Sequence, residues 1–356
     1  METLNFETAG MSKEEIINAR KFVNDIVKDA RKASKHSECL WCGNKASLCN
    51  SHTIPQFILR NIASNGKLKP SSSLLNTDIF SADSGINNAA VFHLICRPCD
   101  GSIFQDYENE DAYKMQPTDK LLNQIALKNV LRDIYKHESE VELYKNAKEI
   151  ALQINSSRES VISKFIDSQR KARERDVQDC YELYHDIRSY MDNNISGMKT
   201  IWFHTLDYVV PIAYQGMIAL TTGFDGEVIT NHYDFSEDYR VEYLQLVIFP
   251  LMTSSVILLF TDNKNTKYDQ FELAMKQLTD EERLKVINYI LFLYTEDYFI
   301  SPSISEEILE NCKRVASSIH DLATVDEERT MTRSVVDFDL KRYDSIPNLL
   351  DPQYAQ

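Results

Sequence analysis

The stretch CLWCGNKASLCNSHTIP, residues 39–55, decides how the N-terminal part of this chain is organised. It opens with a Cys-x-x-Cys pair, and HLICRPCD, residues 93–100, repeats that pattern. Two intervening residues let both sulfurs of a pair turn toward one ion, and a tetrahedral structural zinc takes four such ligands. Because 53 residues separate the pairs, the fold must bring them together. We therefore expect one structural zinc ion, held by Cys39, Cys42, Cys96 and Cys99.

A second zinc arrangement stays open. Cys49 and His52 are spaced so that, with Cys39 and Cys42, they form a closed site of three cysteines and one histidine. That site would leave the second Cys-x-x-Cys pair without a role. The two matched pairs favour the four-cysteine site over this one, and over four unrelated buried cysteines. In that site Cys49 is spare and His52 is free for other chemistry.

Composition indicates a folded protein with more than one hydrophobic core. The chain has 356 residues, of which 43% are apolar and 26% charged. Its polar, acidic start, METLNFETAG, does not resemble a secretion signal, and seven cysteines are too few for a disulfide scaffold. The most apolar run, residues 244–260, contains Pro250 and the polar TSS, so it predicts two buried strands joined by a turn. We expect a cytoplasmic protein without a membrane segment.

Charge is distributed unevenly along the chain. The net charge is −15, which argues against broad attachment to nucleic acid. Residues 1–70 carry eleven Lys and Arg against seven Asp and Glu, a net +4, so the remainder carries −19. DNA or RNA, if bound, is therefore expected at the N-terminal end. The competing interpretation of these cations is an ordinary helix surface. The candidate basic strip consists of Lys28, Arg31, Lys32, Lys35, Arg60 and Lys67.

Hydrophobic periodicity predicts an α+β protein with an N-terminal helix, a zinc-bound unit, a helical middle region and an antiparallel sheet with C-terminal helices. Thr279 and Glu282 have the spacing of a helix capping box. Residues 64–90 are expected to form an insertion loop, and Asp225-Gly226 a hairpin turn. The predicted regions are an N-terminal helix (1–37), the zinc domain (38–116), a helical region with a projecting charged helix (117–198), an α+β domain (199–325) and a poorly packed tail (326–356).

The two cysteine pairs occur in a wider pattern. SHTIPQFILR, residues 51–60, and HLICRPCDGSIFQDYEN, residues 93–109, resemble the HNH (ββα-metal) nuclease superfamily in its zinc-containing branch. They are similar in particular to uncharacterised bacterial proteins that read SHIIPKF and then C-x-x-C-E-x-x-F-S-x-x-E. The resemblance covers residues 39–115. It implies a treble-clef-like unit of two strands and a helix, with the second cysteine pair at the helix start.

The resemblance also implies a catalytic role for His52. In active members the matching histidine is a general base that takes a proton from water, and a divalent metal on helix-borne side chains stabilises the leaving oxygen. This chain has no histidine between Cys99 and His137, where a metal-ligating histidine is expected. Asp100, with Asp106 and Glu108, stands in that region instead, and carboxylates suit Mg²⁺ or Mn²⁺.

The candidate catalytic residues are therefore His52, Asp100 and Glu108. Each has a competing structural interpretation: His52 as a structural histidine or zinc ligand, Asp100 as a helix cap, and Glu108 as an exposed acid. The family's middle asparagine falls near Val91, with Asn87 out of register.

Two functions follow from the sequence. The first is a metal-dependent HNH-like endonuclease, acting as a homodimer on DNA or RNA, with bacterial defence against phage or mobile DNA as the context that the resemblance implies. The alternative is a catalytically inactive, zinc-stabilised scaffold that serves as a protein or nucleic-acid interaction module. The intact SHTIP favours the first, and the missing catalytic residues favour the second.

Overall fold

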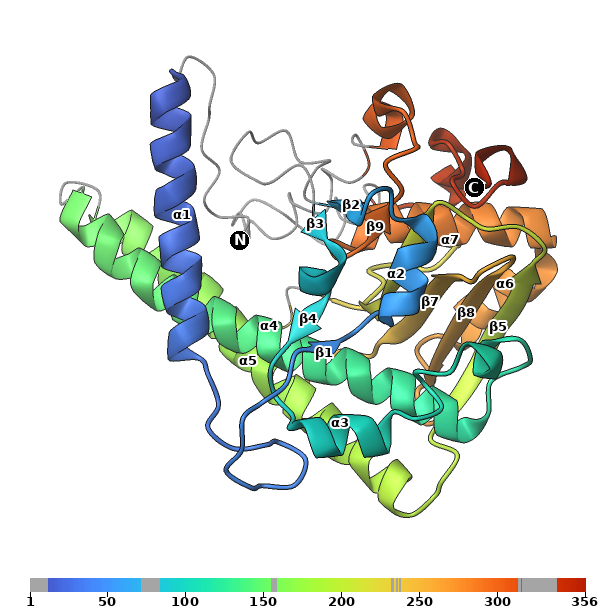
Figure 1. The fold of residues 1–356 in the computed structure, drawn as a ribbon, viewed down its shortest axis with the longest axis horizontal. Helices are drawn as coiled ribbons and strands as arrows, with labels where there is room; N and C mark the ends of the chain where they lie inside the picture. The colour runs from blue at the N-terminus through green and yellow to red at the C-terminus, as the bar shows by residue number, and fades with distance from the viewer. Residues whose placement is uncertain are drawn as a thin grey trace.

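The computed structural model describes residues 12–71, 84–154, 159–231, 238–312 and 338–356, together with 234, 236 and 315. The chain forms an α+β protein, as predicted, in which helices cover a central antiparallel sheet (Figure 1). Among the described residues, no helix has an apolar stretch long enough to cross a membrane.

The central sheet has seven strands in the order β3-β2-β9-β6-β7-β8-β5, and each pair of neighbours is antiparallel. The run at 244–260 forms the two buried strands that were predicted. The strands are β2 (Lys67–Pro70), β3 (Ser84–Gly85), β5 (Met198–Leu206), β6 (Ile212–Ile218), β7 (Leu244–Pro250), β8 (Ser255–Asp262) and β9 (Phe299–Ile300).

Both faces of this sheet are covered, so every residue of the central strand β7 is buried. In β7, Leu246 and Ile248 face a core formed with α6 (Asp269–Gln277) and α7 (Asp280–Tyr294). The alternate residues Val247 and Phe249 face a second core. That second core also contains residues of the predicted zinc domain and of α4 (Asp119–Ile154). The predicted capping box of Thr279 and Glu282 is present at the start of α7.

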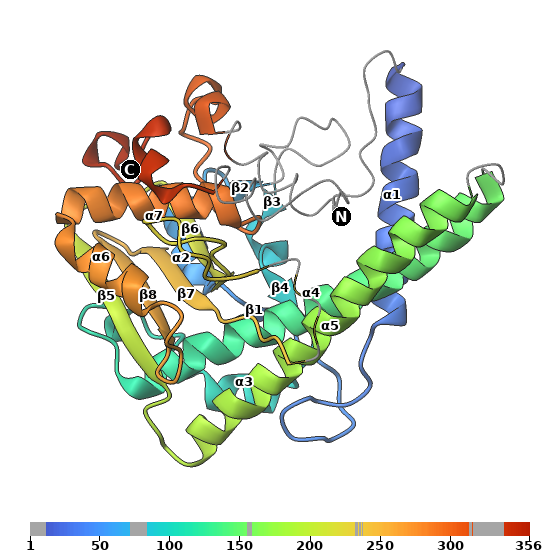
Figure 2. The same ribbon diagram turned by 180° about the vertical axis from the view of Figure 1, so that it is seen from behind.

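Two long helices build the middle region. α4 packs along α5 (Glu159–Asp192), and the end of this pair where they join extends well beyond the sheet in both views (Figures 1 and 2). α1 (Lys13–Ala33) crosses this extension, where its Ile26 and Ala30 pack on Leu143 of α4. The predicted projection of the charged helix is therefore confirmed, and α1 partly covers it.

The predicted zinc domain shares both the large sheet and the second core with the rest of the chain. Its two-stranded ladder pairs β1 (Ser51–His52) with β4 (Val91–Phe92). Three further short elements are α2 (Gln56–Ile62), η2 (Ile86–Asn88) and α3 (Arg97–Ile103).

The predicted insertion loop at 64–90 is wrong in part, since β2, β3 and η2 lie within it, while residues 72–83 lie outside the described part of the chain. β2 pairs with β9 of the C-terminal region, so one sheet joins two of the predicted domains. At Asp225-Gly226 the chain does turn, with φ of 78° at Gly226, but only an isolated bridge between Thr222 and Val228 flanks it.

The prediction of a poorly packed tail is wrong for residues 338–356. Phe338 and Leu350 are at most 1% exposed and belong to the core beneath α7. Asn288 of α7 donates to the Pro347 carbonyl and accepts from the Leu349 backbone N–H, both at 3.0 Å. Residues 326–337 lie outside the described residues. The chain's last segment is thus a structural part of the C-terminal core.

Candidate metal centre and the His52 site

The four predicted zinc ligands meet at one place. Cys96 is the N-cap of α3 and Cys99 lies in its first turn, while Cys39 and Cys42 lie in the loop before β1. The four Sγ atoms all lie within 4.8 Å of one another, and those of Cys42 and Cys96 are 3.9 Å apart. Tetrahedral coordination with Zn–S bonds of about 2.3 Å places sulfurs about 3.8 Å apart. The cluster therefore has the ligand set and spacing to hold a metal ion.

Backbone groups and α5 hold this cysteine loop in place. The Cys96 backbone N–H donates to Cys39 Sγ at 3.3 Å. Burial raises the pKa of Cys39, but hydrogen bonds from backbone N–H groups, including those of Cys42 and Cys96, outweigh it and lower the pKa to about 7. From α5, Tyr184 donates to the Leu40 carbonyl at 3.0 Å. The thiolate form that binds metal is thus favoured at Cys39.

The alternative site with three cysteines and His52 is not formed. The Cys49 thiol donates to the Ile95 carbonyl at 3.3 Å, and burial raises its pKa to about 11, so it remains a thiol. His52 is likewise outside the cluster of four sulfurs. The interpretation of Cys49 as spare agrees with this geometry.

His52 lies on β1, opposite Val91, and is half-buried. Its Nε2 is 3.2 Å from the amide nitrogen of Gln56, which can only donate, so Nε2 accepts and the ring proton is on Nδ1. Burial and then the charge of Lys128 lower the pKa of His52, against a hydrogen bond to the Asn87 backbone and the charge of Asp100. The imidazole is therefore neutral at pH 7, as a general base must be.

Ser51 and His52 point to opposite faces of the β1-β4 ladder, as neighbours on a strand do. His52 contacts Gln56 of α2, whereas the Ser51 hydroxyl donates to Asp100 Oδ1 on α3 at 2.6 Å. The side chain that reaches from β1 to the helix carboxylate is therefore Ser51.

A lysine that sequence reasoning missed occupies the centre of the carboxylate site. Lys128 of α4 is 0% exposed, and its Nζ donates to Asp100 Oδ1 at 2.8 Å and to Ser51 Oγ at 2.7 Å. Glu108 Oε1 is 3.9 Å from the same nitrogen. The ammonium also lies 4.1 Å from the ring centre of Phe104. One buried cation thus contacts both carboxylates that were expected to hold Mg²⁺ or Mn²⁺.

Of the two competing structural interpretations, that of Glu108 as an exposed acid holds, whereas that of Asp100 as a helix cap does not. Asp100 does not cap α3, because the N-cap is Cys96 and the Asp100 carboxylate is bonded to Ser51 and Lys128. α3 ends at Ile103, so Glu108 is not carried on this helix. The Glu108 side chain is 47% exposed, and partial burial raises its pKa.

One signal for Lys128 was present in the sequence. It follows Leu121 and Ile125 at spacings of seven and three, so it lies on the apolar stripe of the helix. A charged residue on such a stripe needs a buried partner. Asp106, the third acid of this region, pairs instead with Lys120 at 2.8 Å.

The predicted basic strip lies on and just after α1, with Arg60 on α2 and Lys67 on β2. The side chains there are exposed, and Arg60 is exposed on α2 and donates to Gln56 at 3.1 Å. Exposed acids, among them Asp25 and Asp29, alternate with the cations on α1. Of the strip, Lys28, Arg31 and Lys32 are exposed on α1, and Lys35 is exposed just beyond its end.

No protein-family model, curated protein or solved structure matches the chain. The candidate site is therefore interpreted from its own geometry.

Proposed function

We propose that this protein is a zinc-stabilised binding protein whose HNH-like unit does not hydrolyse phosphodiesters. The observation behind this proposal is the position of Lys128. Its ammonium pairs with Asp100 at 2.8 Å, where an HNH-like nuclease would hold a divalent cation on its helix. One of the two negative charges that would attract Mg²⁺ is therefore already compensated from within the chain.

Lys128 is poorly suited to leave this position. It is fully buried, and three aromatic rings surround its ammonium, at 4.1 Å for Phe104, 5.3 Å for Tyr107 and 5.8 Å for Phe92. Moving a desolvated cation away from its carboxylate partner costs several kcal/mol. Mg²⁺ needs oxygen ligands at about 2.1 Å in near-octahedral geometry, and an ammonium 2.8 Å from Asp100 Oδ1 occupies the space beside that oxygen.

Lys128 is equally unsuited to replace the metal in catalysis. With none of its surface exposed, its ammonium cannot contact a phosphate group in solvent. His52 in turn lies on the other face of the ladder, where it contacts Gln56. The general base and the positive charge are thus not presented to one substrate.

The four-cysteine cluster in this proposal binds structural zinc. Four thiolates in tetrahedral spacing suit Zn²⁺ and leave no open position for a substrate. Elemental analysis of the purified protein should find about one zinc per chain. Cys96→Ser should lose it, whereas Cys49→Ser, a matched control for a neighbouring cysteine, should retain it. Zinc loss in the control as well would contradict the assigned ligands.

The second candidate is the HNH-like endonuclease itself. The neutral His52, with Nε2 as its acceptor nitrogen, favours it, because this is the protonation state of a general base. In that function Mg²⁺ or Mn²⁺ would bind Asp100 and Glu108 after Lys128 had moved away.

A cleavage assay distinguishes the two functions. Plasmid DNA and RNA are incubated in Mg²⁺ or Mn²⁺ with the wild type, His52→Ala, Lys128→Met and the control Lys120→Met, which changes an exposed lysine of the same helix. Circular dichroism and zinc content establish that each variant is folded. We expect no metal-dependent cleavage by the wild type. Cleavage that needs the metal and is abolished by His52→Ala would show that the nuclease is the correct function.

A further inference from the structure

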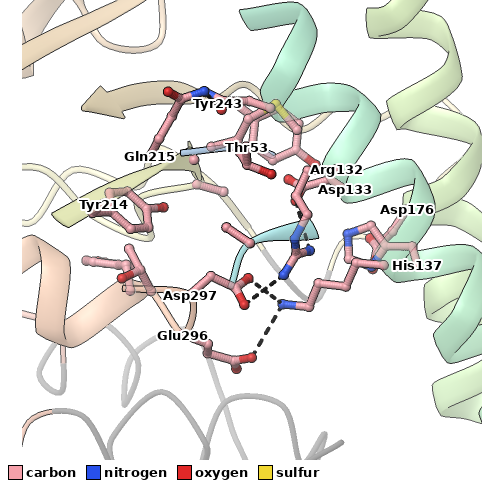
Figure 3. Close-up of a pocket in the computed structure, with 18 of the residues that line it drawn as sticks. Thr53, Arg132, Asp133, His137, Asp176, Tyr214, Gln215, Tyr243, Glu296 and Asp297 are labelled. Carbon is pink, nitrogen blue, oxygen red and sulfur yellow. Dashed lines mark hydrogen bonds and ion pairs between the residues drawn. The ribbon is translucent and has the colours of Figure 1, made fainter. Parts of the chain in front are cut away.

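A second polar site lies on the far side of α4 from the zinc cluster. A cavity of about 280 Å³ lies between α4, α5, strand β6 and the turn after α7 (Figure 3). Its volume is close to the lower limit of small-molecule sites, about 300 Å³. Thr53, the residue after His52, forms part of its wall. The cavity is distinct from the site of Lys128 and Asp100.

Two buried polar atoms that line this cavity have no hydrogen-bond partner among the residues that the structure describes. They are Thr53 Oγ1, in a residue only 2% exposed, and Arg132 Nη1. An unsatisfied buried polar group costs about 1–3 kcal/mol. Two such groups on one cavity indicate that a bound molecule supplies their partners.

The orientation of Arg132 is fixed by its other nitrogen. Its Nη2 pairs with Asp297 at 2.7 Å, and Lys136, one turn further along α4, lies 3.6 Å from the same carboxylate. Nη1 is therefore left for another acceptor, and Figure 3 shows the guanidinium inside the pocket.

Beside this donor lies an acceptor. Asp133 Oδ1 is 3.9 Å from Arg132 Nη1, too far for a hydrogen bond between them. Burial raises the pKa of Asp133, although the charges of His137 and Arg132 lower it. The cavity thus presents an unsatisfied N–H donor next to a carboxylate with spare acceptor capacity.

The charges around the cavity nearly balance, which favours a ligand without net charge. The walls also include the rings of Tyr214 and Tyr243. Burial raises the pKa of both tyrosines, so their hydroxyls keep their protons. Three cations and four acids line the cavity: Arg132, Lys136 and Arg173, and Asp133, Asp176, Glu296 and Asp297.

We infer that this cavity binds a nucleobase by its lactam edge, with Arg132 donating to the ring carbonyl oxygen and Asp133 accepting from the adjacent ring N–H. Guanine and uracil offer this pair of groups, and aromatic walls suit a flat heterocycle. The Thr53 hydroxyl supplies a further hydrogen bond. This inference does not depend on whether His52 is catalytic.

Isothermal titration of the full-length protein tests the inference, with guanosine and uridine as probes. The matched ligands 1-methylguanosine and 3-methyluridine lack the ring N–H. We expect at least one of the two nucleosides to bind, and its methylated form to bind at least about tenfold more weakly. The inference would be overturned if neither guanosine nor uridine bound at millimolar concentration, which is the result for a cavity that holds only water. It would also be overturned if the methylated forms bound equally well.

Variants identify the cavity as the binding site. Asp133→Asn should weaken binding at least about tenfold, whereas Asp192→Asn, the same change on the exposed face of α5, should leave it unaltered. Thr53→Val is informative even where Asp133→Asn fails to fold, because it removes a hydroxyl for which the described part of the chain offers no hydrogen-bond partner. We expect Thr53→Val to be at least as stable as the wild type but to bind less well. Full affinity in Thr53→Val would contradict the proposed contact.

Discussion

Replacement of Lys128 by methionine tests the ion pair on which the proposed function depends. Methionine keeps most of the length and the apolar body of the side chain, so packing against Phe104 and its neighbouring rings is largely preserved. What is lost is the ammonium that donates to Asp100 at 2.8 Å and to Ser51 at 2.7 Å. Among the described residues, the Ser51 hydroxyl then remains as the donor to the Asp100 carboxylate.

The magnitude follows from the burial of the two partners. At 2.8 Å and an effective dielectric constant of about 20, the attraction is about 6 kcal/mol, from which the desolvation of both groups must be subtracted. Removing one partner of a buried pair typically costs about 3–5 kcal/mol. Asp100 is 25% exposed, so water can partly replace the ammonium. We therefore expect a loss of about 3 kcal/mol in the free energy of unfolding, at the low end of that range.

A double-mutant cycle in urea measures this pair. The set comprises the wild type, Lys128→Met, Asp100→Asn and the double variant, with Lys120→Met as the control on the exposed side of α4. The two sites are in contact, so their effects should not add, and we expect a coupling of about 2 kcal/mol. The control should stay within about 0.5 kcal/mol of the wild type.

A small effect would refute this reasoning. If Lys128→Met unfolds within about 0.5 kcal/mol of the wild type, or the coupling is below that value, the ammonium is not paired with Asp100 in solution. The carboxylates would then be available to a divalent cation, and the main support for a non-catalytic HNH-like unit would be lost.

Three further predictions concern the rest of the fold. Thr279→Ala should cost about 1 kcal/mol in urea unfolding, because it removes the α7 cap, and an unchanged midpoint would contradict this. A hydrogen bond to Glu138 raises the pKa of His36 in the folded protein. The protonated His36 therefore stabilises the folded state below the unfolded pKa of about 6.5, and this stabilisation is lost as pH rises through the folded pKa. Glu138→Gln should flatten the pH dependence of the free energy of unfolding between pH 6 and 8.5. A pH profile identical to that of the wild type would exclude this role of the His36–Glu138 pair. Leu350→Ala should cost about 2–5 kcal/mol by the same urea assay, whereas a loss below about 1 kcal/mol would mean that the C-terminal segment is not packed.

The sequence predictions that the structure confirms were based on local patterns. The apolar run at 244–260 is interrupted by Pro250, and it forms the hairpin of β7 and β8. The four-residue span from Thr279 to Glu282 forms the α7 capping box. Cys-x-x-Cys spacing identified two half-sites that meet in one cluster. Each of these features depends on residues that are close in sequence.

The predictions that failed concern long-range packing. Residues 338–356 contain two prolines, a pattern that predicts a loose tail. In the structure, Asn288 of α7 forms hydrogen bonds with the backbone of this segment. β2 is too short to predict alone, because it depends on pairing with β3 on one side and, on the other, with β9 from more than 200 residues away.

The sequence by itself determined the α+β class and the cysteines that can share a metal, because helix caps, strand periodicity and paired ligands are properties of neighbouring residues. Only the tertiary structure decided the chemistry of the candidate site. Lys128 is separated from Ser51 by 77 residues and from Asp100 by 28, and nothing local requires them to meet. Packing of α4 against β1 and α3 desolvates the ammonium, and a desolvated charge must find a partner of opposite sign. That requirement places a lysine, rather than an open metal position, beside the carboxylates.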